Sequence, residues 1–165
     1  MLEDLFLPRK YFIVKGVGLS RRSLLNAFDK ALMDAGIGEY NIVPVSSILP
    51  ENSIELENPV KFKPGTVVFV VMSRIDGVGK TRIGAGIGIA RVVRDDGVTY
   101  GFVVEGHGNG GEEELYNDLK MKLEGMAEVR RTRIVDMKIE TRYLDVPEGY
   151  YGSVIVSVVF APPYY

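Results

Sequence analysis

The sequence predicts an α+β protein in which β-sheets pack face to face, as a single domain over residues 1–165. About seven segments are rich in β-branched and aromatic residues, and two others have the apolar spacing of amphipathic helices. The strands follow one another in runs instead of alternating with helices, which favours α+β over α/β. A length of 165 residues, of which 46% are hydrophobic, is enough for one core.

The first third of the chain is predicted to form a strand, a helix and a second strand. Residues 11–17 are rich in β-forming side chains, and Ser20 is predicted to cap a helix that runs to about Ala35. Gly36 then suits the left-handed position that often follows a helix. Residues 41–45 predict a short strand that ends at two serines. The apolar residues at helical spacing are Leu24, Leu25, Phe28, Ala31, Leu32 and Ala35.

The middle of the chain is predicted to contain three strands after an exposed connection. Residues 50–64 are polar and bounded by prolines, so they are interpreted as that connection. Residues 66–73 form a continuous apolar segment, which predicts a strand, and a turn is expected at residues 77–79. Two further strands are expected over residues 84–93 and 98–105, which are rich in β-branched residues.

The last third is predicted to be a loop, a helix and two strands. The glycine-rich residues 106–111 predict a flexible connection, and a helix is expected over residues 112–129, where three leading glutamates suit the helix dipole. Residues 136–143 alternate polar and apolar side chains, as in a half-buried strand, and residues 154–160 are a final apolar strand. One face of the predicted helix carries Leu115, Leu119, Leu123 and Met126, and one face of the alternating strand carries Met137, Ile139, Thr141 and Tyr143.

Composition excludes several classes of function. The 20 basic and 22 acidic residues give a net charge of −2, so no broad attraction to nucleic acid or to an anionic membrane is expected. The chain has no cysteine, and its one histidine, His107, leaves no histidine cluster for a metal. No apolar stretch reaches the roughly 20 residues that cross a bilayer. Residues 1–10 lack the apolar core of a signal peptide, so we expect a cytoplasmic protein.

The segment LLNAFDKALMDAGIGEYNIVPVSSILP, over residues 24–50, carries a family resemblance. Its features are NAFD within the predicted helix, the AGIG turn, and a Ser46–Ser47–Ile48 junction closed by Pro50. A second match is GFVVEG, in which Glu105 ends a strand. Together these segments resemble the archaeal-type pyruvoyl-dependent arginine decarboxylases, and weaker similarity in the order of strands and helices covers nearly all of the chain.

The resemblance implies a specific architecture and a maturation step. The fold would be a four-layer α-β-β-α sandwich with mostly antiparallel sheets, assembled as a homotrimer with active sites between protomers. The chain would be a zymogen that cleaves itself into residues 1–46, the β chain, and residues 47–165, the α chain. The hydroxyl of Ser47 would attack the carbonyl of Ser46, and the resulting ester would undergo β-elimination. A pyruvoyl group would remain at residue 47, with neither a metal nor pyridoxal phosphate required.

The same resemblance implies a reaction. The pyruvoyl ketone would form a Schiff base with the α-amine of L-arginine and act as the electron sink for loss of CO2. Agmatine would be the product, in the first step of a polyamine route. Glu105 would donate the proton that replaces CO2, which requires a raised pKa and therefore burial.

The resemblance also assigns the substrate contacts. Asn41 would orient the carbonyl of the processed bond and the carboxyl end of the substrate. Asp29 would pair with the guanidinium of arginine, since a carboxylate can make a two-pronged contact with it. Leu32, Gly38 and Ile48 would shape the pocket.

Several alternatives stay open at this point. Without the resemblance, the two serines could be an ordinary loop or cap, and Glu105 and Asp29 could be surface residues. His107 is interpreted as a mobile surface residue, although a role as proton carrier is an alternative. The enzyme could decarboxylate another amino acid, such as histidine, or the chain could be an uncleaved trimer partner.

A further alternative is a nucleotide-binding module at DGVGKT, using Lys80 and Thr81. The full phosphate-binding pattern needs a glycine where Arg74 stands and a helix directly after the motif. The residues that follow predict a strand instead, which makes this alternative weak.

Overall fold

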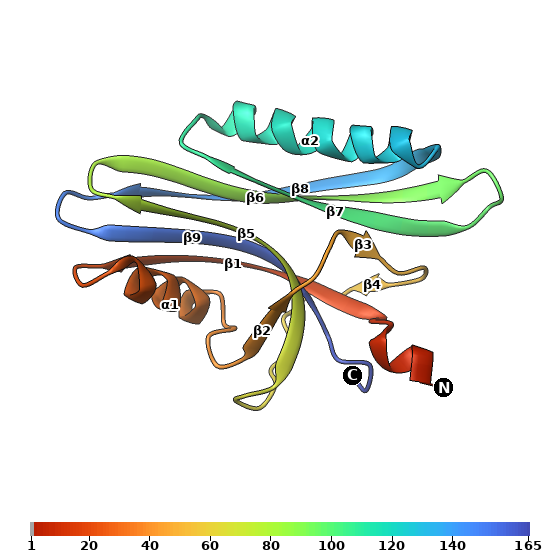
Figure 1. The fold of residues 1–165 in the computed structure, drawn as a ribbon, viewed down its shortest axis with the longest axis horizontal. Coiled ribbons are helices and arrows are strands. Elements are labelled where there is room, and N and C mark those ends of the chain that lie inside the picture. Colours follow the sequence, from red (N-terminus) through yellow and green to blue (C-terminus); the bar gives the residue numbers. More distant parts are fainter. Residues whose placement is uncertain (1) are drawn as a thin grey trace.

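The computed structural model describes residues 2–165, with side chains from Asp4 onward, so Met1 of the predicted domain lies outside the described residues (Figure 1). A short 3₁₀ helix precedes nine strands and two α-helices. Their bounds are η1 Leu2–Phe6, β1 Lys10–Ser20, α1 Leu24–Asp34, β2 Asn41–Pro44, β3 Ile48–Leu49, β4 Ile54–Glu55, β5 Val67–Val78, β6 Thr81–Arg94, β7 Thr99–Gly108, α2 Glu112–Val129, β8 Thr132–Val146 and β9 Tyr151–Phe160.

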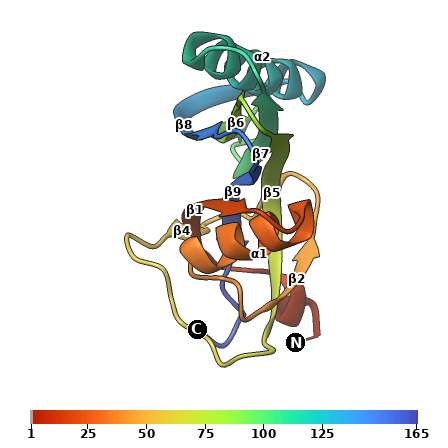
Figure 2. The same ribbon diagram turned by 90° about the vertical axis from the view of Figure 1, so that its left-hand side faces the viewer.

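The strands form two sheets that stack between the two helices. One sheet has five strands in the order β2-β5-β9-β1-β4, and the other has four in the order β3-β7-β6-β8. Among the strands of residues 2–165, only the β1–β4 and β2–β5 pairs are parallel. Helix α1 covers the outer face of the five-stranded sheet and α2 that of the four-stranded sheet (Figures 1 and 2). The predicted α+β sandwich with mostly antiparallel sheets is confirmed.

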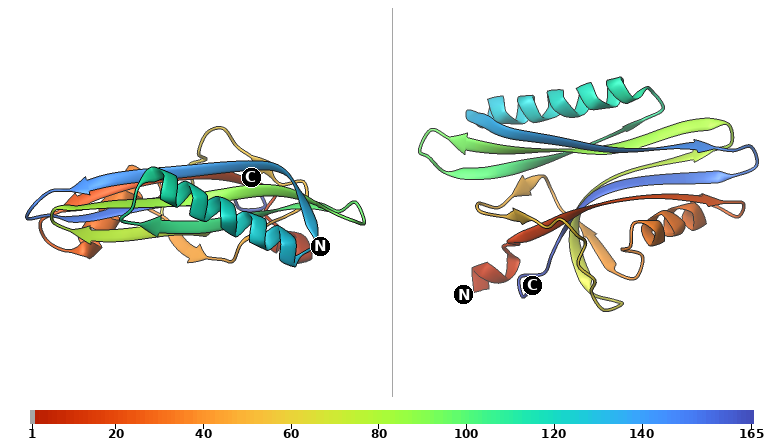
Figure 3. Two further views of the ribbon diagram at one scale, coloured as in Figure 1. Left: turned by 90° about the horizontal axis from the view of Figure 1, so that it is seen from above. Right: turned by 180° about the vertical axis from the view of Figure 1, so that it is seen from behind.

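Three apolar clusters fill the spaces between these layers. The central cluster lies between the sheets and includes Ile83, Ile87, Val103 and Val156. A second joins α1 to the five-stranded sheet, and a third joins α2 to the four-stranded sheet. Helix α2 lies obliquely across the strands beneath it (Figure 3). Leu119 and Leu123 of α2 are fully buried, as the predicted apolar face of that helix requires.

Helix α1 approaches β1 very closely, because glycines lie beneath it. A Cβ atom at Gly16 would lie 2.0 Å from the carbonyl oxygen of Ala31, and one at Gly18 would lie 2.0 Å from that of Ala27. No side chain fits there, so small residues on both elements set the distance between them. Ala27 and Ala31 are fully buried in this contact. The position of α1 is therefore fixed by backbone-to-backbone contact.

The start of α1 differs from the prediction. Ser20 is the last residue of β1, and Ser23 caps the helix, where its hydroxyl accepts from the backbone N–H of Asn26 at 3.1 Å. The predicted role of Gly36 is confirmed, since it follows the last helical turn with φ of 76°. Ser20 and Ser23 are both suited to cap a helix. Because β1 extends to Ser20, the helix begins later and Ser23 is its cap.

Three other boundaries were also wrong, two of them because of glycines. Gly77 lies within β5 and not in a turn, which contains only Gly79 and Lys80. β7 continues through Gly108, so the predicted flexible connection shrinks to residues 109–111 and His107 lies on a strand opposite Ala85. Residues 50–64 also contain the short strand β4. Within residues 2–165, no helix combines the length and the apolar character needed to cross a bilayer.

Candidate functional site

The two serines at residues 46 and 47 join a strand of one sheet to a strand of the other. β2 precedes them in the five-stranded sheet, and β3 follows them in the four-stranded sheet. The backbone N–H of Val45 donates to the carbonyl of Val70 at 2.8 Å. The N–H of Val103 donates to the carbonyl of Ser47, also at 2.8 Å. Both flanks of the Ser46–Ser47 peptide bond are therefore fixed, each by a different sheet.

Ser47 and Glu105 lie on one face of the same strand pair. The β3–β7 ladder pairs Ile48 with Phe102, so Ser47 stands opposite Val103. Glu105 is two residues further along β7 and shares the face of Val103, because side chains alternate along a strand. Diagonal neighbours of this kind lie about 7–8 Å apart. The register therefore brings the candidate nucleophile and the candidate proton donor together.

An open groove of about 540 Å³ lies beside these two residues. Ser47 and Glu105 line one side of it, and α2 supplies the other side. Lys122 of α2 donates to the backbone carbonyl of Glu105 at 2.9 Å and pairs with Asp118 at 2.6 Å. The helix is thereby attached to the edge of β7 where the groove opens.

The carboxyl of Glu105 has a raised pKa. Partial burial raises the pKa above its ordinary value of 4.5, and the positive charges of His107 and Lys122 oppose the shift only in part. The direction of the pKa shift agrees with the prediction, although Glu105 is an exposed residue and its carboxyl is only partly desolvated. A carboxyl with a raised pKa keeps its proton to higher pH, which is what a proton donor near neutrality requires.

A second hollow, of about 550 Å³, opens on the other side of Glu105. Glu105, His107 and Lys122 line it together with Asp118 and Tyr143. Its lining includes three carboxylates and one lysine, because Glu114 also contributes. Glu105 thus stands between two polar hollows and is reachable from both.

The predicted guanidinium contact lies on another part of the molecule. Asp29 is an exposed residue of α1, on the outer side of the five-stranded sheet, and Leu32 follows it on the same helix. Leu25, one turn before Asp29, is 72% exposed. Neither Asp29 nor Leu32 lines the hollows beside Glu105. Helix α1 therefore presents a carboxylate among exposed apolar side chains, away from Ser47 of the same chain.

Gly38 and Asn41 lie between these two regions in the sequence. Gly38 lines a hollow of about 300 Å³ with Tyr40 and Phe62. Asn41 is exposed at the start of β2, and its side-chain amide donates to the carbonyl of Gly65 at 2.9 Å. Its carbonyl oxygen faces no hydrogen-bond donor in the described contacts of the chain.

Ile48 and Ser46 open onto an apolar hollow instead. The space of about 410 Å³ is lined by both residues and by Phe6, Val45 and Phe69. Phe6 is 77% exposed and Ile48 is 43% exposed. The surface on this side of the junction is therefore unusually apolar for a surface facing water.

The nucleotide-binding alternative does not fit the structure. Residues 76–81 form the end of β5, a tight turn and the start of β6, so no helix N-terminus is present to hold a phosphate. Lys80 has φ of 56° and pairs with Glu148 at 3.3 Å. Thr81 donates its hydroxyl to the carbonyl of Val78 at 2.6 Å.

Sequence reasoning missed Lys122, which contacts Glu105 from a distant part of the chain. Only the spacing of Asp118 and Lys122, one helical turn apart, hinted that this face of α2 is polar. The contact itself depends on where α2 crosses β7. Among residues 2–165, no three histidine, aspartate or glutamate side chains gather in an arrangement that could hold a metal ion.

Comparisons with known proteins agree on one family. The family model described as "Pyruvoyl-dependent arginine decarboxylase (PvlArgDC)" matches residues 10–163. The chain is 34% identical over 153 residues to the pyruvoyl-dependent arginine decarboxylase of Methanopyrus kandleri, covering 93% of this chain and 97% of that protein.

Shorter alignments give higher identity. Pyruvoyl-dependent arginine decarboxylase 2 of Methanosarcina acetivorans is 41% identical over 111 residues, which are 65% of this chain and 59% of that protein. Pyruvoyl-dependent arginine decarboxylase 1 of Archaeoglobus fulgidus is 43% identical over 107 residues, which are 62% of this chain and 66% of that protein.

The positive charge of Lys122 is expected to lower the pKa of the Glu105 carboxyl. In Lys122→Met, removal of the nearby positive charge should shift the titration midpoint of the Glu105 carboxyl to higher pH than in the unaltered protein. Carbon-detected NMR titration, with the signal assigned through Glu105→Gln, measures this midpoint. Lys120→Met is the matched control, because Lys120 pairs with Glu124 on the same helix. A midpoint that stays in place or falls in Lys122→Met would contradict the assignment.

Proposed function

The chain belongs to the pyruvoyl-dependent arginine decarboxylase family, and on that basis we propose that it cleaves itself between Ser46 and Ser47 and converts L-arginine to agmatine and CO2. The observation that carries the proposal is the shared groove of Ser47 and Glu105. One residue of that groove can generate the reactive carbonyl, and partial desolvation raises the pKa of the other, the Glu105 carboxyl, above its ordinary value. The names of the relatives supply the substrate.

Self-cleavage uses the hydroxyl of Ser47 and the carbonyl of Ser46. The Oγ atom attacks the carbonyl carbon, the C–N bond breaks, and an ester replaces the peptide bond. Loss of the Cα proton of Ser47 then breaks the Cβ–O bond and frees the carboxylate of Ser46. The dehydroalanine left behind takes up water and releases ammonia, which yields the pyruvoyl group. Firm anchoring on both sides of the bond favours this sequence, because the attack needs a fixed geometry.

The two fragments should stay together after cleavage. Residues 1–46 contain β1, α1 and β2, whereas both sheet neighbours of β1 come from residues 47–165. β1 pairs with β9 along ten residues, from Tyr11 to Ser20. The N-terminal fragment therefore contributes an interior strand, β1, which lies between β9 and β4 of the other fragment.

Decarboxylation would then depend on the groove. The pyruvoyl group supplies a carbonyl that withdraws the electron pair left when CO2 departs. Glu105 would hold a proton on its carboxyl and deliver it to the α-carbon. Lys122 would keep the backbone of Glu105 at the groove through its hydrogen bond to the carbonyl.

The substrate's guanidinium requires a second copy of the chain under this proposal. Asp29, Leu32, Gly38 and Asn41 lie apart from the groove in one chain. We therefore propose a homotrimer in which the α1 side of one protomer faces the groove of its neighbour. The exposed Leu25 on α1 and Ile48 at the junction support an interface there. A cytoplasmic location stays a prediction.

The Ser47→Ala variant should remain a single chain of 165 residues. Without the hydroxyl no ester can form, so electrospray mass measurement under denaturing conditions should show one uncut species. The unaltered protein should give two fragments, of residues 1–46 and 47–165, the second without a free α-amine. Ser46→Ala is the control, because it keeps the attacking hydroxyl. Cleavage of Ser47→Ala at this bond would contradict the mechanism.

Glu105→Gln should lower kcat about 10²- to 10⁴-fold, the range expected for loss of a general acid. Glu105 must be protonated to act, so activity of the unaltered enzyme should fall as pH rises through its raised pKa. That fall should vanish from the residual activity of the variant. Release of CO2 as a function of pH measures both effects. Glu113→Gln is the control, since Glu113 lines neither hollow. An unchanged kcat would remove Glu105 from the mechanism.

Asp29→Asn should lower kcat/KM for arginine about 10- to 150-fold, because a charge-assisted hydrogen bond contributes about 1.5–3 kcal/mol. Self-cleavage should be unaffected. The exposed Asp95 in the β6–β7 hairpin provides the control Asp95→Asn. The same assay with histidine tests the alternative substrate. If Asp29→Asn kept the kcat/KM of the unaltered enzyme, Asp29 would not contact the guanidinium.

A further inference from the structure

Arg91 of β6 binds the loop that follows the cleavage junction. Its Nη1 donates to the hydroxyl of Ser53 at 3.2 Å, and its Nη2 donates to the backbone carbonyl of the same residue. Nη2 also lies 3.5 Å from the hydroxyl of Tyr11 on β1. Ser53 is only 5% exposed, so this contact is shielded from water. One guanidinium thus binds both oxygen atoms of a single buried residue.

The reach of Arg91 follows from a row of three residues across the sheet. Leu49 on β3 pairs with Gly101 on β7, which in turn pairs with Arg91 on β6. Directly paired residues point to the same face of a sheet. A Cβ atom at Gly101 would lie 3.1 Å from the Cβ of Leu49 and 2.9 Å from the carbonyl of Ala90. With no side chain in the middle of the row, Leu49 is fully buried and Arg91 extends to the loop beyond it.

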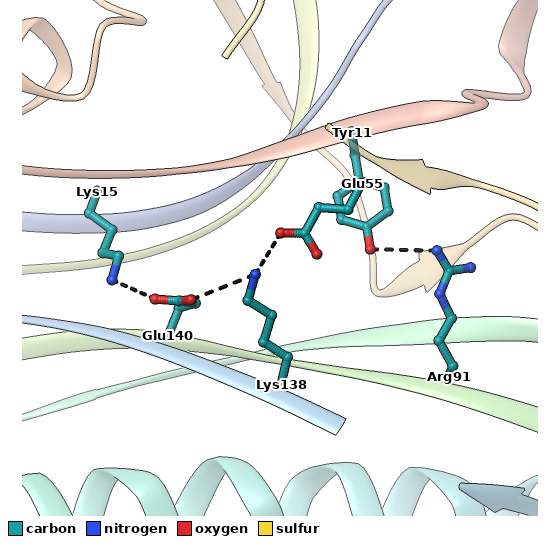
Figure 4. A network of polar contacts seen from close by, with 6 residues as sticks. All are labelled: Tyr11, Lys15, Glu55, Arg91, Lys138 and Glu140. Atoms are coloured by element: carbon teal, nitrogen blue, oxygen red, sulfur yellow. Dashed lines mark hydrogen bonds and ion pairs between the residues drawn. The ribbon is translucent and has the colours of Figure 1, made fainter. Parts of the chain in front are cut away.

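A second cationic side chain of the four-stranded sheet, Lys138, binds the chain just after Ser53, at Glu55. Lys138 on β8 pairs with Glu55 at 2.6 Å and lies 3.7 Å from Glu140, which pairs with Lys15 of β1 at 2.5 Å (Figure 4). Figure 4 shows this chain of ion pairs and the Arg91–Tyr11 contact on either side of Glu55. The segment after the junction is therefore attached to both sheets.

Cleavage would change what holds residue 47. Before cleavage, Ser47 is held on one side by Val45, whose N–H donates to the carbonyl of Val70, and on the other side by its own carbonyl, which accepts from Val103 of β7. Afterwards the connection to β2 is gone, and residue 47 is a chain end held by the hydrogen bond from Val103 to its carbonyl and by the residues that follow it. The next firm attachment beyond the two-residue strand β3 is Ser53. The position of residue 47 therefore depends more on the Arg91–Ser53 contact after the peptide bond is cut than before.

We propose that Arg91 is a positioning residue for decarboxylation, which acts by holding residues 48–53 so that the new chain end stays beside Glu105. This assignment rests on the proposed function, because it presumes cleavage at Ser47. It predicts that cleavage and decarboxylation depend on Arg91 to different degrees. Loss of Arg91 should impair turnover by the cleaved enzyme more than it slows cleavage itself, since the uncut chain has a second anchor.

The test compares Arg91→Met, Arg91→Lys and the control Arg94→Met. Arg94 is on the same strand but is exposed and pairs with Asp96 in the hairpin. Denaturing mass measurement gives the rate of cleavage, and kcat is expressed per cleaved chain. We expect kcat of Arg91→Met to fall at least about tenfold with KM within twofold, and cleavage to slow by a smaller factor. Arg91→Lys should recover part of kcat because it keeps one charged donor. Arg94→Met should match the unaltered enzyme.

Three outcomes would overturn the assignment. One is a kcat per cleaved chain within twofold of the unaltered enzyme in both Arg91 variants. Another is a kcat of Arg91→Met that equals that of the unaltered enzyme when both are assayed at temperatures well below the thermal unfolding midpoint of the variant. That result would show that Arg91 acts only through stability. If Arg91→Met does not fold, Arg91→Lys with unchanged kcat decides against the proposal. An uncut unaltered chain that releases no CO2 would instead overturn the proposed function itself.

Discussion

The passage of the chain from one sheet to the other at Ser46–Ser47 is the constraint on which the site depends. β2 belongs to one sheet and β3 to the other, and only three residues separate them. A connection this short leaves the peptide bond little freedom, because hydrogen bonds hold the chain on both sides of it. The same crossing brings Ser47 to the edge of β7, where Glu105 stands two residues further along.

The sandwich separates the functional residues into two groups. The groove at Glu105 belongs to the four-stranded sheet and α2, while Asp29 and Leu32 belong to α1 on the opposite outer layer. A single chain therefore presents the proposed reactive centre and the proposed guanidinium contact on different sides. Assembly of like chains is the simplest way to unite them, and the apolar side chains exposed on both sides are suited to it.

The sequence predicted those elements in which local pattern and tertiary contacts agree. The bounds of α2 were predicted correctly because an acidic first turn and a continuous apolar face both mark them. The alternating strand 136–143 was found, although β8 extends beyond it at both ends, and its apolar face was correct, since Met137 and Ile139 lie beneath α2. Glycines misled the prediction because they were interpreted as chain breakers. Gly106 instead stays in β7 and makes room for α2, as a Cβ there would lie 3.0 Å from Leu115 and Leu119.

The site was only partly accessible from sequence, for a related reason. Ser47 and Glu105 could be chosen by resemblance, but Lys122, Arg91 and Ser53 become neighbours only through strand order and register. No local pattern in the sequence encodes those contacts.

The half-buried setting of Ser47 has an implication for the kind of chain end that can exist there. An ordinary amino terminus carries an ammonium group, which loses hydration when protein surrounds it on several sides. Lys122 and Arg130 already line the same groove, so a third cation would also be repelled. A terminus ending in a ketone is neutral and carries no such penalty. The maturation chemistry would thus produce a chain end that this interior can tolerate, where simple proteolysis would leave one that it disfavours.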